Sequence, residues 1–297
     1  MKKVLISAIN YRCSKEAIEL IKSLKNLNYK DFNILILDNS ENEDYKPIKK
    51  AFPKVNLLIN QNIGVSGGIN QAMGYAEKNK FDYLLMLDAD VELDTNCLKE
   101  MVQVALDNPQ AAIIGAKSYY YNEKNILQDV SRTYHPYKGS LSRDIGGEDK
   151  SQFENIKEVN YVWGGCLLFD IEKMRGIGRI DERYFLFYDT MDIQFRAETL
   201  GYKVLYAPKA KLWHKVSRSQ GGTSKIFDYY SIRNRILIVK KFNTKSQKFI
   251  FYLYFFIIAL PFKTLKHIIK GKFSTIKWNF IGLFDAILGK WGRKNFN

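Results

Sequence analysis

The stretch YLLMLDADVELD, residues 83–94, runs from an apolar segment straight into a row of carboxylates. Its four acids stand at positions 88, 90, 92 and 94, and in an extended chain residues spaced by two point to one side. Carboxylates held this close repel one another unless water, a proton or a cation relieves the repulsion. A solubilising turn is one explanation for such acids, but their alternation favours a bound divalent cation.

Short apolar segments alternate with helical ones around this stretch. We predict strands at residues 2–10, 32–40, 55–60, 82–90 and 111–116, and helices at 14–27, 65–79 and 95–108. This alternation is typical of an α/β fold with a mostly parallel sheet covered by helices on both faces. Ligands bind beyond the carboxyl ends of such strands. The polar residues at these ends, which predict a nucleotide pocket, are Asn10, Asp38, Asn60 and Asp88.

The second half of the chain is less regular. Residues 131–158 are polar and weakly periodic, which favours a long loop. Order returns beyond it, with a helix predicted at 189–200 and a strand at 202–208 that leads to His214. The Gly- and Ser-containing residues 217–225 predict a mobile loop.

Composition excludes several classes of protein. A chain of 297 residues with 46% hydrophobic side chains can bury a substantial core, so disorder is excluded as its main state. The three cysteines are widely spaced and form no CxxC pair, which argues against a disulfide framework or a zinc site. The apolar run at the N-terminus ends at Asn10 and is too short for a signal peptide. These features predict a reduced, cytoplasmic setting.

Most of the net charge of +15 lies at the end of the chain. From Lys240 onward there are twelve Lys or Arg and one acid, Asp285, which gives a local charge of +11. The run 249–262 has 14 residues without charge, short of the roughly 20 that a spanning helix needs. Lysines mixed with bulky aromatics follow, and this mixture predicts helices in a membrane interface beside anionic lipid. A helical cap with a solvated basic face is the alternative, and no nucleic-acid motif accompanies the charge.

Seven segments stand in one order along residues 2–241. They are ISAINYR, LILDNS, NQNIGVSGGINQAM, LMLDADVEL, VWGGCLLFD, YFLFYDTMDIQFRAETLGYKVLYAPKAKLWH and YYSIRNRILIVKK. Together they resemble glycosyltransferase family 2, and most closely its rhamnosyltransferase-like bacterial members that build surface polysaccharides. The resemblance implies a GT-A fold at 1–240, with a nucleotide-sugar half at 1–118 and an acceptor half at 119–240. Residues 241–297 would be a basic, amphipathic helical tail.

For the acidic edge, the resemblance implies a metal site. Asp90 and His214 would bind a divalent cation, and Asp88 would meet the donor's ribose or a metal-bound water. Oxygen ligands with one imidazole suit Mn²⁺ or Mg²⁺. Such a cation stabilises the charge that builds up on a departing diphosphate. A solvated strand end and a structural histidine are the alternatives.

The resemblance also implies a pocket for the donor nucleotide. Asp38 would accept a hydrogen bond from N3–H of uracil or thymine, although an Asx-turn also fits this position. Asn10 would line the same base pocket. Further donor contacts are implied for Asn62, Gly64, Gly68, Asn70 and Arg218. Arg218 and Arg233 carry guanidinium forks that suit a diphosphate, with a solvated arginine as the alternative for each.

The acceptor side is implied to include Trp163, Gly164 and Gly165. A flat indole stacks on a sugar face, and the glycines leave room beside it. An aromatic residue at the end of a strand is as often part of the core, so both readings of Trp163 stay open.

The catalytic base departs from the family pattern. That pattern is Glu-Asp-x-Asp, with the base commonly its second residue, and here residues 189–192 read Asp-Thr-Met-Asp. Thr190 cannot act as a base at neutral pH. The base is then Asp189 or Asp192, or activity is impaired. We favour Asp189 because it opens the helix, and a buried ion pair with Arg196 is the structural alternative for Asp192.

These features predict a metal-dependent, inverting glycosyltransferase. It would use a UDP- or dTDP-linked sugar and extend a lipid-linked saccharide in surface polysaccharide synthesis, attached peripherally to the cytoplasmic face of the cell membrane. A catalytically inactive relative that binds nucleotide-sugar or a partner enzyme is the alternative, motivated by Thr190. A nucleic-acid partner is not expected. The sequence leaves both a monomer and a homodimer open.

Overall fold

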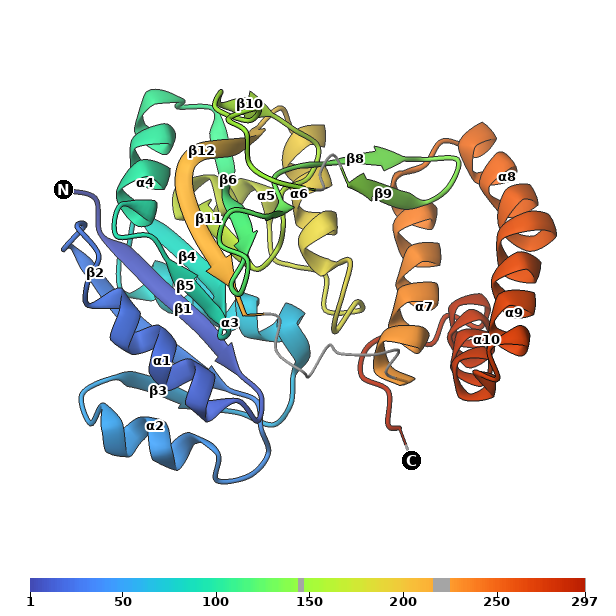
Figure 1. The fold of residues 1–297 in the computed structure, drawn as a ribbon, viewed down its shortest axis with the longest axis horizontal. Helices are drawn as coiled ribbons and strands as arrows, with labels where there is room; N and C mark the ends of the chain where they lie inside the picture. The colour runs from blue at the N-terminus through green and yellow to red at the C-terminus, as the bar shows by residue number, and fades with distance from the viewer. Residues whose placement is uncertain (144–146, 216–224, 297) are drawn as a thin grey trace.

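The computed structural model describes residues 1–143, 147–215 and 225–296 (Figure 1). The strands are β1 (Val4–Asn10), β2 (Phe32–Asp38), β3 (Asn56–Ile59), β4 (Tyr83–Asp88), β5 (Val91–Leu93), β6 (Ala111–Tyr120), β7 (Leu127–Asp129), β8 (Arg132–His135), β9 (Ser140–Arg143), β10 (Lys157–Glu158), β11 (Cys166–Asp170) and β12 (Lys203–His214). The helices are α1 (Ser14–Leu24), α2 (Tyr45–Ala51), α3 (Gly64–Lys78), α4 (Cys97–Asp107), α5 (Ile171–Ile177), α6 (Asp189–Thr199), α7 (Lys225–Phe242), α8 (Lys245–Tyr254), the π-helical η2 (Phe255–Ala259), α9 (Leu260–Ile269) and α10 (Phe273–Ile287).

The predicted parallel strands form one side of a ten-stranded sheet. Eight strands follow the order β10-β12-β6-β11-β4-β1-β2-β3, and β5 and β7 pair with β12 and β6. Strands β4, β1, β2 and β3 are all parallel. Their register sets Asn10 beside Asp38 and Ile9 beside Asp88, so the polar residues that end these strands meet at one edge. This arrangement confirms the α/β prediction for the first half of the chain.

Helices cover both faces of the sheet, as predicted. Helices α1 and α4 pack on one face and α3, α5 and α6 on the other, each through the buried side chains of an apolar stripe. In α1 this stripe is Ala17, Leu20, Ile21 and Leu24, which recur at the three- and four-residue spacing of one helix face.

The rest of the sheet is mixed rather than mostly parallel. Strand β11 is antiparallel to both of its neighbours, β4 and β6. Strand β12 runs parallel to β6 and continues beyond the predicted strand as far as His214, where its end pairs with β5. This pairing draws the end of β12 to the acidic turn that follows β4.

The long loop predicted at 131–158 contains a hairpin, β8–β9, so the prediction was wrong there. Tertiary contacts with the C-terminal helices stabilise this polar hairpin. The Tyr134 hydroxyl donates to Asn243 Oδ1 at 2.7 Å, and Asn243 donates in turn to the Pro136 carbonyl at 2.7 Å. Gly139 sits in the turn with a φ of 58°, where a Cβ would lie 2.7 Å from Val239 and Phe251. Local sequence alone does not reveal such long-range support.

Helices α7 to α10 stand beside the sheet in Figure 1. Helix α7 packs on α10, and a third hydrophobic cluster joins α6, α7, α8 and α10. Residues Lys245–Ile269 form a continuous helical stretch of 25 residues with a mean hydropathy of 1.6. By length and composition this stretch is able to cross a membrane. It exceeds the 14-residue uncharged run because Lys263 and Lys266 are embedded in it.

Candidate active site

Two acids and a histidine meet at the carboxyl end of β4. The side chains of Asp88, Asp90 and His214 each offer a ligand atom, and these atoms all lie within 4.8 Å of one another. His214 Nε2 lies 3.2 Å from Asp90 Oδ1. Asp90 and His214 are nearly fully buried, at 9% and 3% exposure. The sheet therefore brings His214 to two acids that lie far before it in the sequence.

Strand pairing fixes this geometry. His214 lies opposite Val91 in the β5–β12 ladder, and the Lys215 amide donates to the Asp90 carbonyl at 2.9 Å. The carboxamide of Gln128, on β7, lies within hydrogen-bonding distance of His214 Nδ1, its nitrogen at 2.7 Å and its oxygen at 3.0 Å. Gln128 thereby orients the imidazole with Nε2 toward Asp90. A hydrogen-bond partner on the other ring nitrogen orients metal-binding histidines in the same way.

The three residues fit a divalent cation. His214 Nε2 is buried and makes no hydrogen bond to any described residue, although Asp90 is close. Burial and the neighbouring Asp90 carboxylate raise the pKa of Asp88 to about 6, and His214 opposes the shift. A cation would relieve the repulsion between these carboxylates and occupy the lone pair of His214. Two carboxylates and an imidazole are a donor set suited to Mn²⁺ or Mg²⁺.

The predicted acceptor residues lie against this group. The Asp88 amide donates to the Gly165 carbonyl at 2.9 Å. A Cβ on Gly165 would lie 2.6 Å from Asp88 Oδ2 and 2.3 Å from the ring of Trp163, so both need glycine there. The Trp163 and His214 rings are 4.7 Å apart between centroids. At Gly164 a Cβ would lie 2.5 Å from the hydroxyl oxygen of Thr190.

Asp189 is the first residue of α6 and is 3% exposed. Its carboxylate accepts from the Thr190 amide at 2.9 Å and from the Ser66 hydroxyl at 3.3 Å. Burial raises the pKa of Asp189 to about 6, and the hydrogen bonds from Thr190 and Ser66 oppose this rise. A carboxylate with a raised pKa accepts a proton more readily, which is the property that a general base requires.

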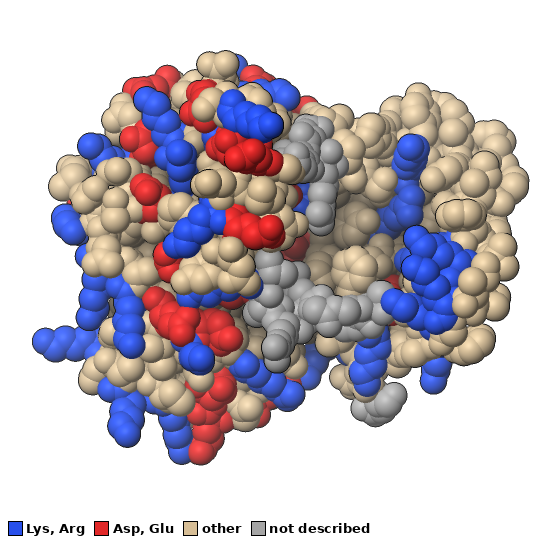
Figure 2. Space-filling view, viewed as in Figure 1, with Lys and Arg blue, Asp and Glu red and all other residues tan. Residues whose placement is uncertain are grey.

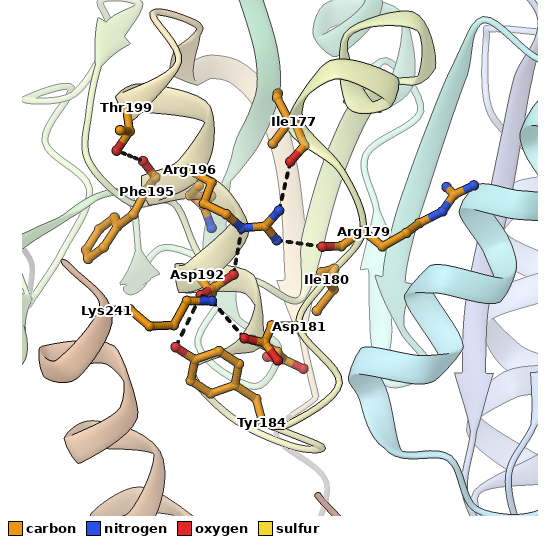
Figure 3. A network of polar contacts seen from close by, with 12 residues as sticks. Ile177, Arg179, Ile180, Asp181, Tyr184, Asp192, Phe195, Arg196, Thr199 and Lys241 are labelled. Carbon is orange, nitrogen blue, oxygen red and sulfur yellow. Dashed lines mark hydrogen bonds and ion pairs between the residues drawn. The ribbon is translucent and has the colours of Figure 1, made fainter. Parts of the chain in front are cut away.

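Asp192 has a structural environment (Figure 3). It is fully buried, accepts from Arg196 Nε at 2.8 Å and forms an ion pair with Lys241 of α7. Lys241 also bridges to Asp181 at 2.7 Å, and the Tyr184 hydroxyl donates to Asp192 at 3.3 Å. The expected pair with Arg196 is therefore present. A carboxylate held by two cations is a poor base, and this observation favours Asp189.

The turn before α6 is unusual and was not foreseen from the sequence. Phe185, Phe187 and Tyr188 all have a φ near +65°, a conformation rare for residues with a side chain. The buried amide of Asn234, on α7, donates to the carbonyls of residues 184, 186 and 187 at 2.8–3.0 Å. This contact holds the strained turn that precedes Asp189.

Arg233 has a different place from the expected diphosphate contact. It is 1% exposed, and its guanidinium donates to the carbonyls of Arg183 and Tyr184, both at 2.9 Å, and of Gly292 at 2.6 Å. It therefore joins three backbone segments. Arg218 and the predicted mobile loop, apart from Lys225, lie outside the described residues.

The predicted base pocket is organised around Asp38. Its Oδ1 accepts from Asn10 at 2.5 Å and from the Ser40 hydroxyl at 2.8 Å. Its Oδ2 is buried, and no described residue donates a hydrogen bond to it. Asn10 also donates to Asp44 at 3.0 Å. One carboxylate oxygen is thus fixed by neighbours and the other is left as an acceptor.

The glycine-rich segment that opens α3 packs closely on other parts of the fold. Asn62 Oδ1 caps the Gly64 amide at 3.1 Å. Gly64 has a φ of 73°, and a Cβ on it would lie 2.3 Å from the Phe185 carbonyl oxygen. A Cβ on Gly68 would lie 2.6 Å from Ile9. Asn70 bonds the backbone of Ile180 through both ends of its amide. Donor contacts by these four residues stay predictions.

An α/β sheet with an acidic turn and a histidine at the end of its last long strand is the arrangement that the resemblance to GT-A glycosyltransferases implied. The chain belongs to glycosyl transferase family 2, whose profile matches residues 4–178. The resemblance to the family is thereby confirmed, with five of the seven segments inside the matched residues, and the protein is a glycosyltransferase.

Two curated relatives cover most of the chain. The low-salt glycan biosynthesis hexosyltransferase Agl10 of Haloferax volcanii is 21% identical over 297 residues, which cover 97% of this chain and 92% of the relative. The N-acetylglucosaminyl-diphospho-decaprenol L-rhamnosyltransferase of Mycobacterium tuberculosis is 20% identical over 73% of this chain and 77% of its own length. These likenesses support a role in glycan or polysaccharide biosynthesis.

Solved structures share the fold. The mannosyltransferase PcManGT of Pyrobaculum calidifontis, in complex with GDP-Man and Mn²⁺, aligns with a TM-score of 0.58 at 11% identity over 97% of this chain and 86% of its own. GalNAc-T7 with UDP, GalNAc and Mn²⁺ aligns with a TM-score of 0.61 at 13% identity over 80% of this chain and 48% of its own.

Proposed function

We propose that this protein is a metal-dependent, inverting glycosyltransferase that moves a sugar from a nucleotide-sugar to a lipid-linked saccharide. The observation that carries the proposal is the group Asp88, Asp90 and His214 at the strand edge, with Asp189 on the adjoining helix. Manganese in two structural relatives adds support for a cation at this edge.

The proposed reaction is a single displacement in which Asp189 is the base. Asp189 removes the proton from the acceptor hydroxyl as its oxygen attacks the anomeric carbon of the donor sugar. The bond from that carbon to the nucleoside diphosphate breaks, and attack from the opposite side inverts the configuration. Asp90, His214 and Asp88 would hold a divalent cation, and this cation would supply Lewis-acid stabilisation of the leaving diphosphate. Trp163, Gly164 and Gly165 form the acceptor-binding side of the site, next to Asp88 and His214.

The donor is proposed to carry uridine or thymidine. Asp38 Oδ2 is a buried acceptor with no donor among the described residues, and it matches the N3–H that uracil and thymine share. A buried acceptor without a hydrogen-bond partner destabilises the protein. A base whose N–H donates to this acceptor therefore binds more tightly than a base without such an N–H. A mycobacterial relative named as a rhamnosyltransferase makes dTDP-rhamnose one candidate.

A donor screen tests this function. We expect the full chain with Mn²⁺ to release UDP or dTDP from at least one nucleotide-sugar, and to do so faster with a lipid-linked saccharide present. Chelation of the metal should abolish release, and NMR of the product should show the opposite anomeric configuration. Binding of nucleotide with Mn²⁺ but no turnover with any donor would instead support the inactive relative suggested by Thr190.

We also propose that η2 and α9 attach the protein to the inner face of the cell membrane. Ile258, Phe262, Leu265 and Ile269 follow one another at three- and four-residue spacing and are 56–77% exposed. On the face shown in Figure 2 the C-terminal helices carry mostly uncharged and basic side chains, whereas acids are mixed with bases elsewhere. An apolar stripe flanked by lysines suits an anionic lipid surface.

Vesicle flotation tests the attachment. Ile258→Ser combined with Phe262→Ser should lower binding to anionic vesicles by about tenfold or more, because each change removes roughly 1.5–3 kcal/mol of apolar burial. Leu106→Ser, at a 48% exposed leucine of α4, is the matched control and should bind normally. Normal flotation of the double variant would contradict the attachment. If the wild type resists extraction from membranes by carbonate, a membrane-spanning helix rather than peripheral attachment is indicated.

A further inference from the structure

We propose that residues 293–296 form a wall of the donor pocket, and that Arg293 in this wall binds the diphosphate of the donor nucleotide. This inference rests on the proposed function, since it deepens the description of the same site. A pocket of about 540 Å³ lies between the strand edge and the end of the chain. One side is built by Ile9, Asn39, Asn62 and Gly64, and the other by Arg293 to Phe296.

The wall is an anchored part of the fold. The Gly292 amide donates to the Arg183 carbonyl at 2.9 Å, and the Lys294 amide donates to the Tyr230 hydroxyl at 2.9 Å. The Phe296 ring packs on Trp278 at 4.9 Å and edge-on against Tyr229 at 5.5 Å between centroids. These contacts hold the end of the chain beside the start of α7 (Figure 1). The wall is therefore in place before a ligand enters.

The charges in this pocket suit an anion. The charged side chains among its described lining residues are Arg12, Lys225, Arg293, Lys294 and Glu41. Lys294 is paired with Asp285 at 2.8 Å. The other three cations face one carboxylate and still leave an excess of positive charge in a space large enough for a nucleotide. Such an excess favours a ligand with two negative charges or more, as a diphosphate ester has.

Arg293 is the side chain best suited to grip it. Its two terminal nitrogens hold the two oxygens of Glu41 at 2.7 and 2.8 Å. A guanidinium fork that fits a carboxylate in this way fits two phosphate oxygens equally well. Both partners are partly exposed, 42% for Arg293 and 31% for Glu41. Exposed pairs of this kind contribute little to stability, so a diphosphate can displace Glu41 at small cost.

The opposite side of the pocket favours the donor as the source of the diphosphate. Ile9 and Asn39 line the pocket and are the chain neighbours of Asn10 and Asp38, whose own side chains are not among its described lining residues. The pocket therefore lies at the strand edge near which the base is proposed to bind. A polyprenyl diphosphate of the acceptor offers the same group. It would approach without a base to engage that edge, and the nucleotide therefore fits the pocket better.

Calorimetry with UDP, dTDP and GDP on the full-length protein tests the proposal. For the nucleotide that the wild type binds most tightly, Arg293→Gln should weaken binding by about tenfold or more, since a hydrogen bond to a charged group is lost. Glu41→Gln should tighten it several-fold, because the competing carboxylate is gone. Lys290→Gln removes the same charge from an exposed position outside the pocket and should bind as the wild type does.

The outcomes separate this inference from the function on which it rests. If the wild type binds none of the three nucleotides, both fail. If it binds one and Arg293→Gln binds equally well, or Glu41→Gln binds more weakly, the inference alone is overturned. If Arg293→Gln no longer binds vesicles that carry a polyprenyl diphosphate but keeps the nucleotide affinity of the wild type, the assignment of the diphosphate to the donor is overturned. Thermal melting confirms that each variant is folded.

Discussion

Replacing Asp189 by Asn should lower the rate of sugar transfer by about 10²–10⁴-fold and leave donor affinity nearly unchanged. The amide keeps the shape of the carboxyl group but cannot take the acceptor's proton. The fold should not suffer, because burial raises the pKa of Asp189 and its charge therefore opposes folding at neutral pH. Single-turnover rates and nucleotide titrations measure the two effects separately.

Asp192→Asn is the matched comparison three residues along the same helix. It removes a buried charge held by Arg196 and Lys241, so it should lower the free energy of unfolding by about 1–3 kcal/mol with a much smaller effect on rate.

Wild-type kcat/KM should fall as the pH drops through about 6, because Asp189 becomes protonated. A cation bound beside Asp88 would move this fall to a lower pH. A normal rate in Asp189→Asn would transfer the role of base elsewhere.

Asp90→Ala should lower Mn²⁺-dependent transfer by at least about 10²-fold, since stabilisation by the cation amounts to several kcal/mol. The reason is geometric: Asp90 lies 3.2 Å from His214 Nε2 and shares the site with Asp88. The variant should also need a higher Mn²⁺ concentration for half-maximal rate. A titration of the rate with Mn²⁺ measures both effects.

Glu92→Ala provides the control, because Glu92 belongs to the same row of acids. On β5 it lies 3.8 Å from Lys124 and is not one of the three residues that converge at the site. It should retain the wild-type dependence on Mn²⁺. Equal losses in Asp90→Ala and Glu92→Ala would point to a general effect of negative charge. An unchanged rate in Asp90→Ala would remove the metal site from the mechanism.

The sequence was most informative where local pattern and tertiary structure agree. Apolar strands alternating with amphipathic helices predicted the parallel strands β1 to β4 and placed Asn10, Asp38 and Asp88 at one edge. The hairpin β8–β9 was missed because its support comes from Asn243 and other residues about a hundred positions away. The full length of β12 was missed because its end is fixed by pairing with β5.

The site divides in the same way. The resemblance to a family suggested that His214 joins the acids, but no spacing rule shows that β12 ends opposite β5. The turn at 185–188 contains no glycine, so its sequence does not predict residues with a left-handed φ. The sequence around Asn234 likewise does not predict its hydrogen bonds to the carbonyls of this turn. Arg293 and Glu41 meet across almost the whole length of the chain, and no local pattern can predict such a pair.

Helix α7 sets a limit on how far the protein can be shortened from its C-terminal end. A shortened chain that stopped at Lys240 would keep every residue proposed to touch the sugar being transferred. It would lack Lys241, leaving Asp181 and Asp192 without their shared cation beneath the catalytic helix. A cut before α7 would also release the carbonyls that Asn234 holds. A fragment that keeps these contacts therefore has to extend at least through Phe242, where α7 ends, and one that also keeps the proposed diphosphate contact has to include Arg293.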